Sequence, residues 1–325
     1  MKSIASYISY AYKPRRKFYS MGGMLLLIGV LMNPQCKKIK EKIEFPYNLA
    51  KPDREIHLDK MLSEVSGLSF ISETEVALIQ DEIGSIFFYD IEKNTIIKKI
   101  TFAKKGDYED LKIIGDTGYV LRSDGNLVQL SGLIDGNVRE NNLNTPLSGK
   151  NNTEGLCYDD QKKLLLIACK GKPEVTKKDQ DFENKKAVYS FDPVTKTLSD
   201  TPYVMVDVNE VQKISRGTYS NVIEKLVRFY TKAGAVHSFE PSGISIHPVT
   251  RDLYIISSVG KVLVIVSPEG LLTNVIKLDP KVFKQPEGIA FDAAGNLYIS
   301  NEGRQGKGNI LEFKIINKIP KLPDL

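Results

Sequence analysis

The chain has 325 residues, of which 45 are Lys or Arg and 40 are Asp or Glu, for a formal net charge of +5. Residues 1–40 contain eight of the basic residues and no carboxylate, so the rest of the chain carries 37 bases and 40 acids. A body so close to neutrality lacks the basic surface that nucleic-acid binding requires. Its 42% hydrophobic and 26% charged residues exclude a disordered or collagen-like chain.

The first segment has the pattern of an export signal. Basic residues at 13–17 precede an apolar run over residues 21–32, which is shorter than the roughly 20 residues a membrane-spanning helix needs. Cys36 follows this run and precedes a lysine-rich stretch. We expect residues 1–35 to be a signal or anchor, residues 36–53 a tether, and Cys36 a lipidated residue. An uncleaved anchor is the alternative, and both place the body outside the cytoplasm, on the plasma membrane or the outer membrane.

Five later segments share one pattern, in which a Gly or Asp is followed by alternating apolar residues. Their aligned residues are separated by 43, 45, 88 and 45 positions, and 88 is twice 44. Such regular spacing indicates an internal repeat of about 44 residues. The aligned residues are Gly67, Asp110, Gly155, Gly243 and Gly288.

Within each repeat the apolar residues alternate with period two, and Gly- or Asn-containing turns separate the stretches. This is typical of four short strands joined as hairpins, the size of one β-propeller blade. We therefore predict an all-β fold, a single propeller over residues 54–317, followed by a short tail at 318–325. Residues 55–59 resemble residues 275–279, and the last repeat ends after its third strand. An N-terminal strand is thus expected to complete the last blade and close the ring.

The 88-residue interval leaves the number of blades open. Residues 209–233 have helical spacing of apolar residues and no strand pattern, which indicates a helical insertion. Five blades follow from the repeats, and a degraded repeat inside the interval would make six.

The inner strands of a propeller line a central channel, so the polar residues of the repeat are candidates for a ligand site. The residue before each aligned Gly or Asp falls at one height on this wall, and strand ends add further polar groups. Among these, Glu109, Glu154 and Glu287 form a predicted Ca²⁺ site, because carboxylate oxygens suit a hard cation. The alternative is a structural role, with these carboxylates accepting hydrogen bonds from neighbouring blades. The full predicted ligand-binding set is Glu64, Asp81, Glu82, Glu109, Arg122, Glu154, Lys170, Ser242, Ser258, Glu287, Asn301 and Glu302.

Familiar catalytic motifs do not occur in this sequence. No His lies in an H-E-x-x-H or H-x-E context, and there is no G-x-S-x-G, phosphate-binding loop or dinucleotide fingerprint. Cys157 and Cys169 are expected to be packed thiols. These observations favour a binding or scaffold module for a small ligand, glycan or protein. A Ca²⁺-dependent hydrolase of lactones or phosphoesters is the second hypothesis.

The repeats at residues 154–159, 240–247 and 285–302 resemble those of the SdiA-regulated (YjiK-like) family, and the likeness extends over about residues 54–315. NHL, gluconolactonase and phytase-like propellers share the same hairpin. The resemblance implies an envelope-associated β-propeller, often with a membrane anchor, whose molecular activity is undefined. It also implies six blades, against the five that the repeats predict, and it supplies no catalytic residues.

Overall fold

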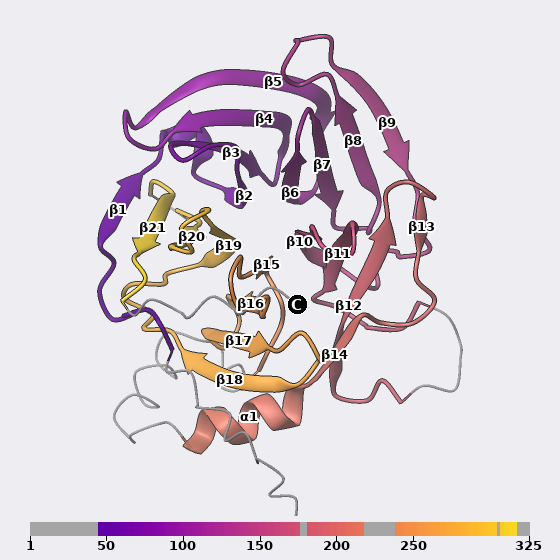
Figure 1. The fold of residues 1–325 in the computed structure, drawn as a ribbon, viewed down its shortest axis with the longest axis vertical. Coiled ribbons are helices and arrows are strands. Elements are labelled where there is room, and N and C mark those ends of the chain that lie inside the picture. The colour runs from indigo at the N-terminus through magenta and orange to yellow at the C-terminus, as the bar shows by residue number, and fades with distance from the viewer. Residues whose placement is uncertain (1–44, 176–180, 218–237, 304–305, 317–325) are drawn as a thin grey trace, which may run out of the picture. The chain divides into compact units, whose positions relative to one another are not determined.

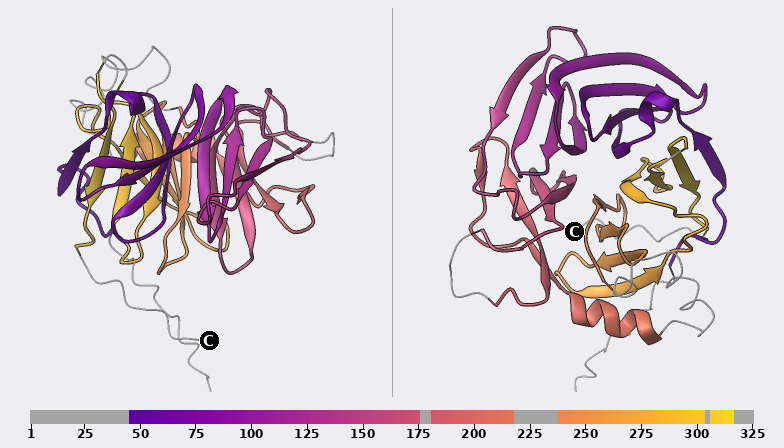
Figure 2. Two further views of the ribbon diagram at one scale, coloured as in Figure 1. Left: turned by 90° about the horizontal axis from the view of Figure 1, so that it is seen from above. Right: turned by 180° about the vertical axis from the view of Figure 1, so that it is seen from behind.

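The computed structural model describes residues 45–175, 181–217, 238–303 and 306–316, which form five antiparallel sheets around one axis (Figure 1). Each sheet is one blade, and its strands run along the axis when the ring is viewed from the side (Figure 2). The inner strand of every blade contacts the inner strands of both neighbours, in the cyclic order β2, β6, β10, β15 and β19. The predicted single β-propeller is confirmed, with five blades rather than six.

The blades follow one another along the chain. Blades 1 and 2 contain β2 (Val65–Phe70), β3 (Glu75–Gln80), β4 (Ile83–Asp90) and β5 (Thr95–Lys105), then β6 (Tyr108–Ile114), β7 (Thr117–Arg122), β8 (Leu127–Ser131) and β9 (Arg139–Leu143). Blade 3 contains β10 (Thr153–Asp159), β11 (Leu164–Cys169), β12 (Lys185–Asp192), β13 (Thr197–Leu198) and β14 (Val204–Asp207). Blades 4 and 5 contain β15 (Gly243–Ile246), β16 (Leu253–Ser257), β17 (Val262–Val266) and β18 (Leu272–Lys277), then β19 (Pro286–Phe291), β20 (Leu297–Asn301), β21 (Asn309–Phe313) and β1 (Arg54–His57). A 3-10 turn, Lys60–Leu62, links β1 to blade 1.

Strand β1 closes the ring as predicted. It pairs with β21 at the outer edge of blade 5, from Arg54 opposite Glu312 to His57 opposite Asn309. The Arg54 guanidinium forms ion pairs with Glu312 of blade 5 at 2.7 Å and with Glu92 of blade 1 at 2.9 Å. One side chain of the closing strand therefore ties the last blade to the first, and the edge of β21 is covered.

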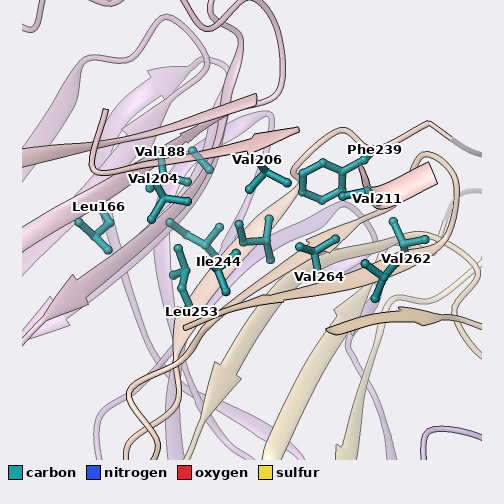
Figure 3. Packing of buried hydrophobic residues seen from close by; sticks show 14 of the residues in the cluster. Leu166, Val188, Val204, Val206, Val211, Phe239, Ile244, Leu253, Val262 and Val264 are labelled. Carbon is teal, nitrogen blue, oxygen red and sulfur yellow. The ribbon is translucent and has the colours of Figure 1, made fainter. Parts of the chain in front are cut away.

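Apolar side chains fill the space between neighbouring blades. The buried residues form five clusters in the described part of the chain, one at each blade interface. Figure 3 shows the interface of blades 3 and 4, where Val188 and Val204 face Ile244 and Leu253. Cys157 belongs to the same cluster as a free, buried thiol, and Cys169 is also free and buried, as predicted. Each buried aliphatic side chain contributes about 1.5–3 kcal/mol, so these interfaces are the main source of stability.

The residues before β1 pack onto the propeller. Tyr47 and Leu49 are buried in the interface of blades 4 and 5, although the sequence pattern placed them in a tether. The Tyr47 hydroxyl donates to the Gly295 carbonyl at 2.5 Å and lies 3.0 Å from Nε2 of the buried His247. The propeller therefore includes a short N-terminal arm, residues 45–49, which has no strand pattern and so could not be recognised as part of a blade.

The helical insertion is confirmed as one short helix. Helix α1, Val208–Gly217, follows β14 on the outside of the ring and contacts β18 (Figure 1). Residues 218–237, which include the rest of the insertion predicted at 209–233, lie outside the described residues, as do residues 1–44 with Cys36 and the tail at 318–325. None of the helices in the described residues has the length and hydropathy needed to span a bilayer.

Candidate functional site

A cavity of about 200 Å³ lies where the inner strands of the five blades meet. Every blade contributes to its wall, so the cavity is on the axis of the ring. Six of its lining residues carry carboxylates and one carries an ammonium group. The lining residues are Glu64, Val65, Ser66, Asp81, Glu109, Glu154, Lys170, Ser242, Gln285, Glu287 and Glu302.

Backbone irregularities in the inner strands direct the repeat residues into this cavity. In β2, β6 and β10 the pairing register shifts at the residue before the aligned Gly or Asp, which makes Ser66, Glu109 and Glu154 the extra residues of β-bulges. A similar shift in β19 includes Glu287. A bulge re-aims the side chain of its extra residue, and here it turns a polar side chain towards the axis.

The aligned glycines allow the inner strands to approach closely enough to enclose the cavity. A Cβ atom on Gly67 would lie 2.7 Å from the Cα of Asp110, in the next blade. In the second repeat the aligned residue is Asp110 instead of a glycine. Its carboxylate accepts a hydrogen bond from the Leu156 amide of blade 3 at 2.7 Å. These contacts fix the distances between blades and hence the width of the cavity.

Three of the carboxylates that line the cavity form a possible cation site. One oxygen from each of Glu64, Asp81 and Glu302 lies within 4.8 Å of the others, and all three residues are half-buried. Asp81 Oδ1 is buried and has no hydrogen-bond partner among the described residues. Burial and the Glu64 charge raise the pKa of Asp81, and burial with a hydrogen bond to Glu64 raises the pKa of Glu302 to about 8. Carboxylates that repel one another in this way fit a hard cation.

The cavity is also lined by the three glutamates that the repeat predicted. Lys170 Nζ lies 2.6 Å from Glu154 Oε1, and Asn152 donates to the same oxygen at 3.1 Å. Burial and the Glu154 charge raise the pKa of Glu109 to about 9 and that of Glu287 to about 7. Burial alone would lower the pKa of Lys170, but the surrounding carboxylates outweigh it and raise that pKa. The ammonium group thus offsets part of the negative charge of these three glutamates.

The remaining predicted residues are distributed over several positions. Ser242 lines the cavity, but its hydroxyl donates to the Pro286 carbonyl of blade 5 at 2.9 Å. Ser258 hydrogen-bonds Glu287 from just behind the wall. Besides Ser258, three predicted residues do not line the cavity: Glu82 is exposed and 3.5 Å from Lys105, Arg122 is exposed beside Asp124, and Asn301 is buried and donates to Asn309.

Gln285 also lines the cavity but was not among the predicted residues. It is aligned with Glu64 in the repeat, three positions before Gly288 as Glu64 is before Gly67. The alignment of the repeats therefore contained the signal that places it at the cavity.

The fold and the cavity define the class of protein, a five-bladed β-propeller with an acidic axial cavity. The model of the SdiA-regulated family matches residues 46–304, and the chain belongs to the SdiA-regulated family. None of the curated proteins matches the sequence.

Several solved structures are similar to this chain at low identity. Glutaminyl cyclase from Myxococcus xanthus has a TM-score of 0.49 and 14% identity, over 82% of this chain and 95% of that one. The PQQ-bound aldose sugar dehydrogenase from Streptomyces coelicolor has a TM-score of 0.47 and 11% identity, over 82% and 97%. The virginiamycin B lyase from Staphylococcus aureus has a TM-score of 0.43 and 13% identity, over 82% and 89%.

Proposed function

We propose that this protein is a ligand-binding module of the cell envelope, whose axial cavity binds Ca²⁺ at Glu64, Asp81 and Glu302. The observation that carries the proposal is the convergence of six carboxylates and one ammonium group on a cavity of about 200 Å³. A fixed excess of negative charge in a semi-enclosed space raises the local concentration of cations. The buried Asp81 Oδ1, without a hydrogen-bond partner among the described residues, supports a cation between Asp81, Glu64 and Glu302.

The number of carboxylates at the proposed Ca²⁺ site suggests how a small-molecule ligand could bind there. Ca²⁺ takes six to eight oxygen ligands, and Glu64, Asp81 and Glu302 supply three side chains. The other positions are then available to water or to oxygen atoms of a small molecule or glycan. Such a cation would serve as the attachment point for a ligand rather than as a closed structural site.

Calcium titration by isothermal calorimetry tests this proposal. Wild-type protein is expected to bind one Ca²⁺, and Asp81→Asn is expected to weaken binding roughly tenfold or more, because a charged ligand is lost. The adjacent Glu82→Gln is the matched control, since Glu82 is exposed and does not line the cavity. Absence of binding by the wild type, or equal weakening by both variants, would refute the proposal.

A hydrolase is the second candidate, and the pKa of Glu287 favours it. A carboxyl group with a pKa of about 7 exchanges protons readily at neutral pH, as a general acid or base must. Bound Ca²⁺ would supply Lewis-acid chemistry beside it. Hydrolysis of a lactone or a phosphoester that is lost in Glu287→Gln, with Ca²⁺ binding retained, would support this function. No turnover by the wild type would exclude it for those substrates.

The sequence of the first 40 residues supports a position at the membrane. We propose that the chain is exported and anchored through lipid on Cys36, with an uncleaved N-terminal anchor as the alternative. The propeller would then present its cavity outside the cytoplasm to a small ligand, a glycan or a partner protein.

A further inference from the structure

A second and larger depression, of about 590 Å³, borders the central cavity over blade 3. Lys170 lines both spaces, so the two are neighbours. The charged residues that line the central cavity are mainly carboxylates, whereas those that line the second space are mainly lysines. The second space, which we call the basic cleft, is lined by Lys150, Lys170, Lys172, Lys185 and Lys186, with Glu174 and Glu240 as its carboxylates.

Backbone hydrogen bonds fix the positions of the cleft lysines. The Lys172 amide donates to the Lys150 carbonyl at 2.9 Å, so the two residues lie side by side on neighbouring segments. The buried Asn151 side chain donates to the carbonyls of Lys172 and Glu174, at 2.9 and 3.0 Å. The ammonium groups of Lys150 and Lys172 therefore extend from a rigid support, and both residues are exposed.

Lys186 is held at the junction of the cleft and the cavity. Its ammonium group donates to the carbonyls of Lys170 and Gly171, which orient it without neutralising it. Burial lowers the pKa of Lys186, and the charge of Glu240, which also lines the cleft, acts in the opposite direction. By contrast, Lys170 is paired with Glu154 and Lys185 with Asp181. Among the described residues, no ion pair neutralises Lys150, Lys172 or Lys186.

Aromatic side chains give the cleft an apolar part. Phe239 is fully buried in the interface of blades 3 and 4, and Phe182 is half-buried at the lining. A positively charged pocket that also has apolar residues in its wall can bind a small oxyanion and can contact the carbon framework of a ligand that carries one. The lysines would bind the oxygen atoms of the anion by charge-assisted hydrogen bonds.

We propose that the basic cleft is a second binding site, for small molecules that carry a carboxylate or phosphate oxyanion. Lys150, Lys172 and Lys186 contact the oxyanion, and the rest of the ligand extends past Lys170 towards the axial cavity. The site does not depend on a cation in the cavity. Its existence and the proposed Ca²⁺ site are therefore tested separately.

Calorimetric titration with pyrophosphate, in metal-free buffer at low salt, tests the cleft. Wild-type protein is expected to bind pyrophosphate, and Lys172→Gln and Lys186→Gln are each expected to weaken binding roughly tenfold. Lys281→Gln, at an exposed lysine away from the cleft, is the matched control and should bind as the wild type does. Asp81→Asn should also bind pyrophosphate normally, which separates this site from the Ca²⁺ site.

Two outcomes would overturn the inference. One is that wild-type protein shows no binding of pyrophosphate at millimolar concentration. The other is that Lys172→Gln and Lys281→Gln weaken binding equally, which would indicate attraction by net charge alone. Lys172 is exposed, so its substitution tests the cleft even where Lys186→Gln affects folding.

Discussion

Glu109 shows how the cavity links a single side chain to stability. Burial and the Glu154 charge raise its pKa to about 9, well above the usual carboxyl value. The folded protein therefore binds a proton at Glu109 that the unfolded chain releases near pH 4.5. Stability from this group is present below pH 4.5 and is lost as the pH rises towards 9.

Glu109→Gln should remove this loss of folding stability at high pH, because a glutamine side chain has no proton to release. We expect the melting temperature of the variant to exceed that of the wild type by a few degrees at pH 8–9 and to match it near pH 5. About 1 kcal/mol corresponds to about 2–4 °C in a domain of this size. Thermal unfolding of both proteins, with exposed Glu82→Gln as control, measures the difference. A variant that is less stable at pH 8–9 would show that the Glu109 charge is stabilising.

His247 should have the opposite dependence on pH. Burial lowers its pKa to about 4, and Nδ1 accepts the amides of Val249 and Thr250, so the ring is neutral when folded. The unfolded chain binds a proton at this histidine near pH 6.5, whereas the folded protein does so only near pH 4. The contribution of His247 to the free energy of unfolding is therefore present above pH 6.5 and is lost as the pH falls towards 4. His247→Asn keeps an acceptor near those amides but cannot be protonated. The wild type should lose more stability than the variant between pH 6.5 and 4, and parallel curves would contradict this.

Which residues reach the cavity could be predicted in part. The repeat places Glu109, Glu154 and Glu287 at one height, and all three line the cavity. Adjacent residues at a strand end point to opposite sides, so Asp81 enters the cavity while Glu82 points to Lys105. The pattern alone could not distinguish these two. Nor could it group Glu64, Asp81 and Glu302, because two of them belong to blade 1 and one to blade 5.

At the scale of elements, the N-terminal arm and β1 hold the ring closed. Tyr47, Leu49 and Ile56 are buried between blades, and Arg54 joins blades 5 and 1. A chain that begins at residue 59 would lose these side chains and leave the edge of β21 open. Because each buried large side chain contributes about 2–5 kcal/mol, we expect a loss of at least about 5 kcal/mol and aggregation.

A chain that begins at residue 45 is the matched control, since it keeps the arm and β1. Denaturant unfolding of the two truncated proteins measures the difference in free energy. Equal midpoints for the two would contradict closure by β1. The closing strand was predictable from the likeness of residues 55–59 to residues 275–279, whereas the arm has no such likeness.

At the scale of the whole molecule, the number of blades followed from the spacing of the repeats. The 88-residue interval was ambiguous because spacing alone does not distinguish a missing blade from an insertion. Blade 3 accounts for part of the interval, since both β13 and β14 pair with β12, and α1 for another part. The interval therefore holds the outer strands of blade 3 and a helix, and the described residues of it form no sixth blade.

The proposed lipidation of Cys36 predicts where the protein is found in the cell. Cys36→Ser should move the propeller from the membrane fraction to the soluble fraction, because the variant lacks the residue that we propose to be lipidated. Fractionation and immunoblotting of the full chain measure this, with the buried Cys169→Ala as a control for a cysteine change alone. A Cys36→Ser protein that stays in the membrane at unchanged size would instead indicate an uncleaved anchor.

The central claim is that the acidic cavity holds a cation at Glu64, Asp81 and Glu302. An anomalous difference map from crystals grown with Ca²⁺ tests it most directly. The account predicts one peak among these three carboxylates, at the distances of about 2.3–2.6 Å that are typical of calcium–oxygen contacts. A peak among Glu109, Glu154 and Glu287 instead, or a cavity without a peak, would contradict it.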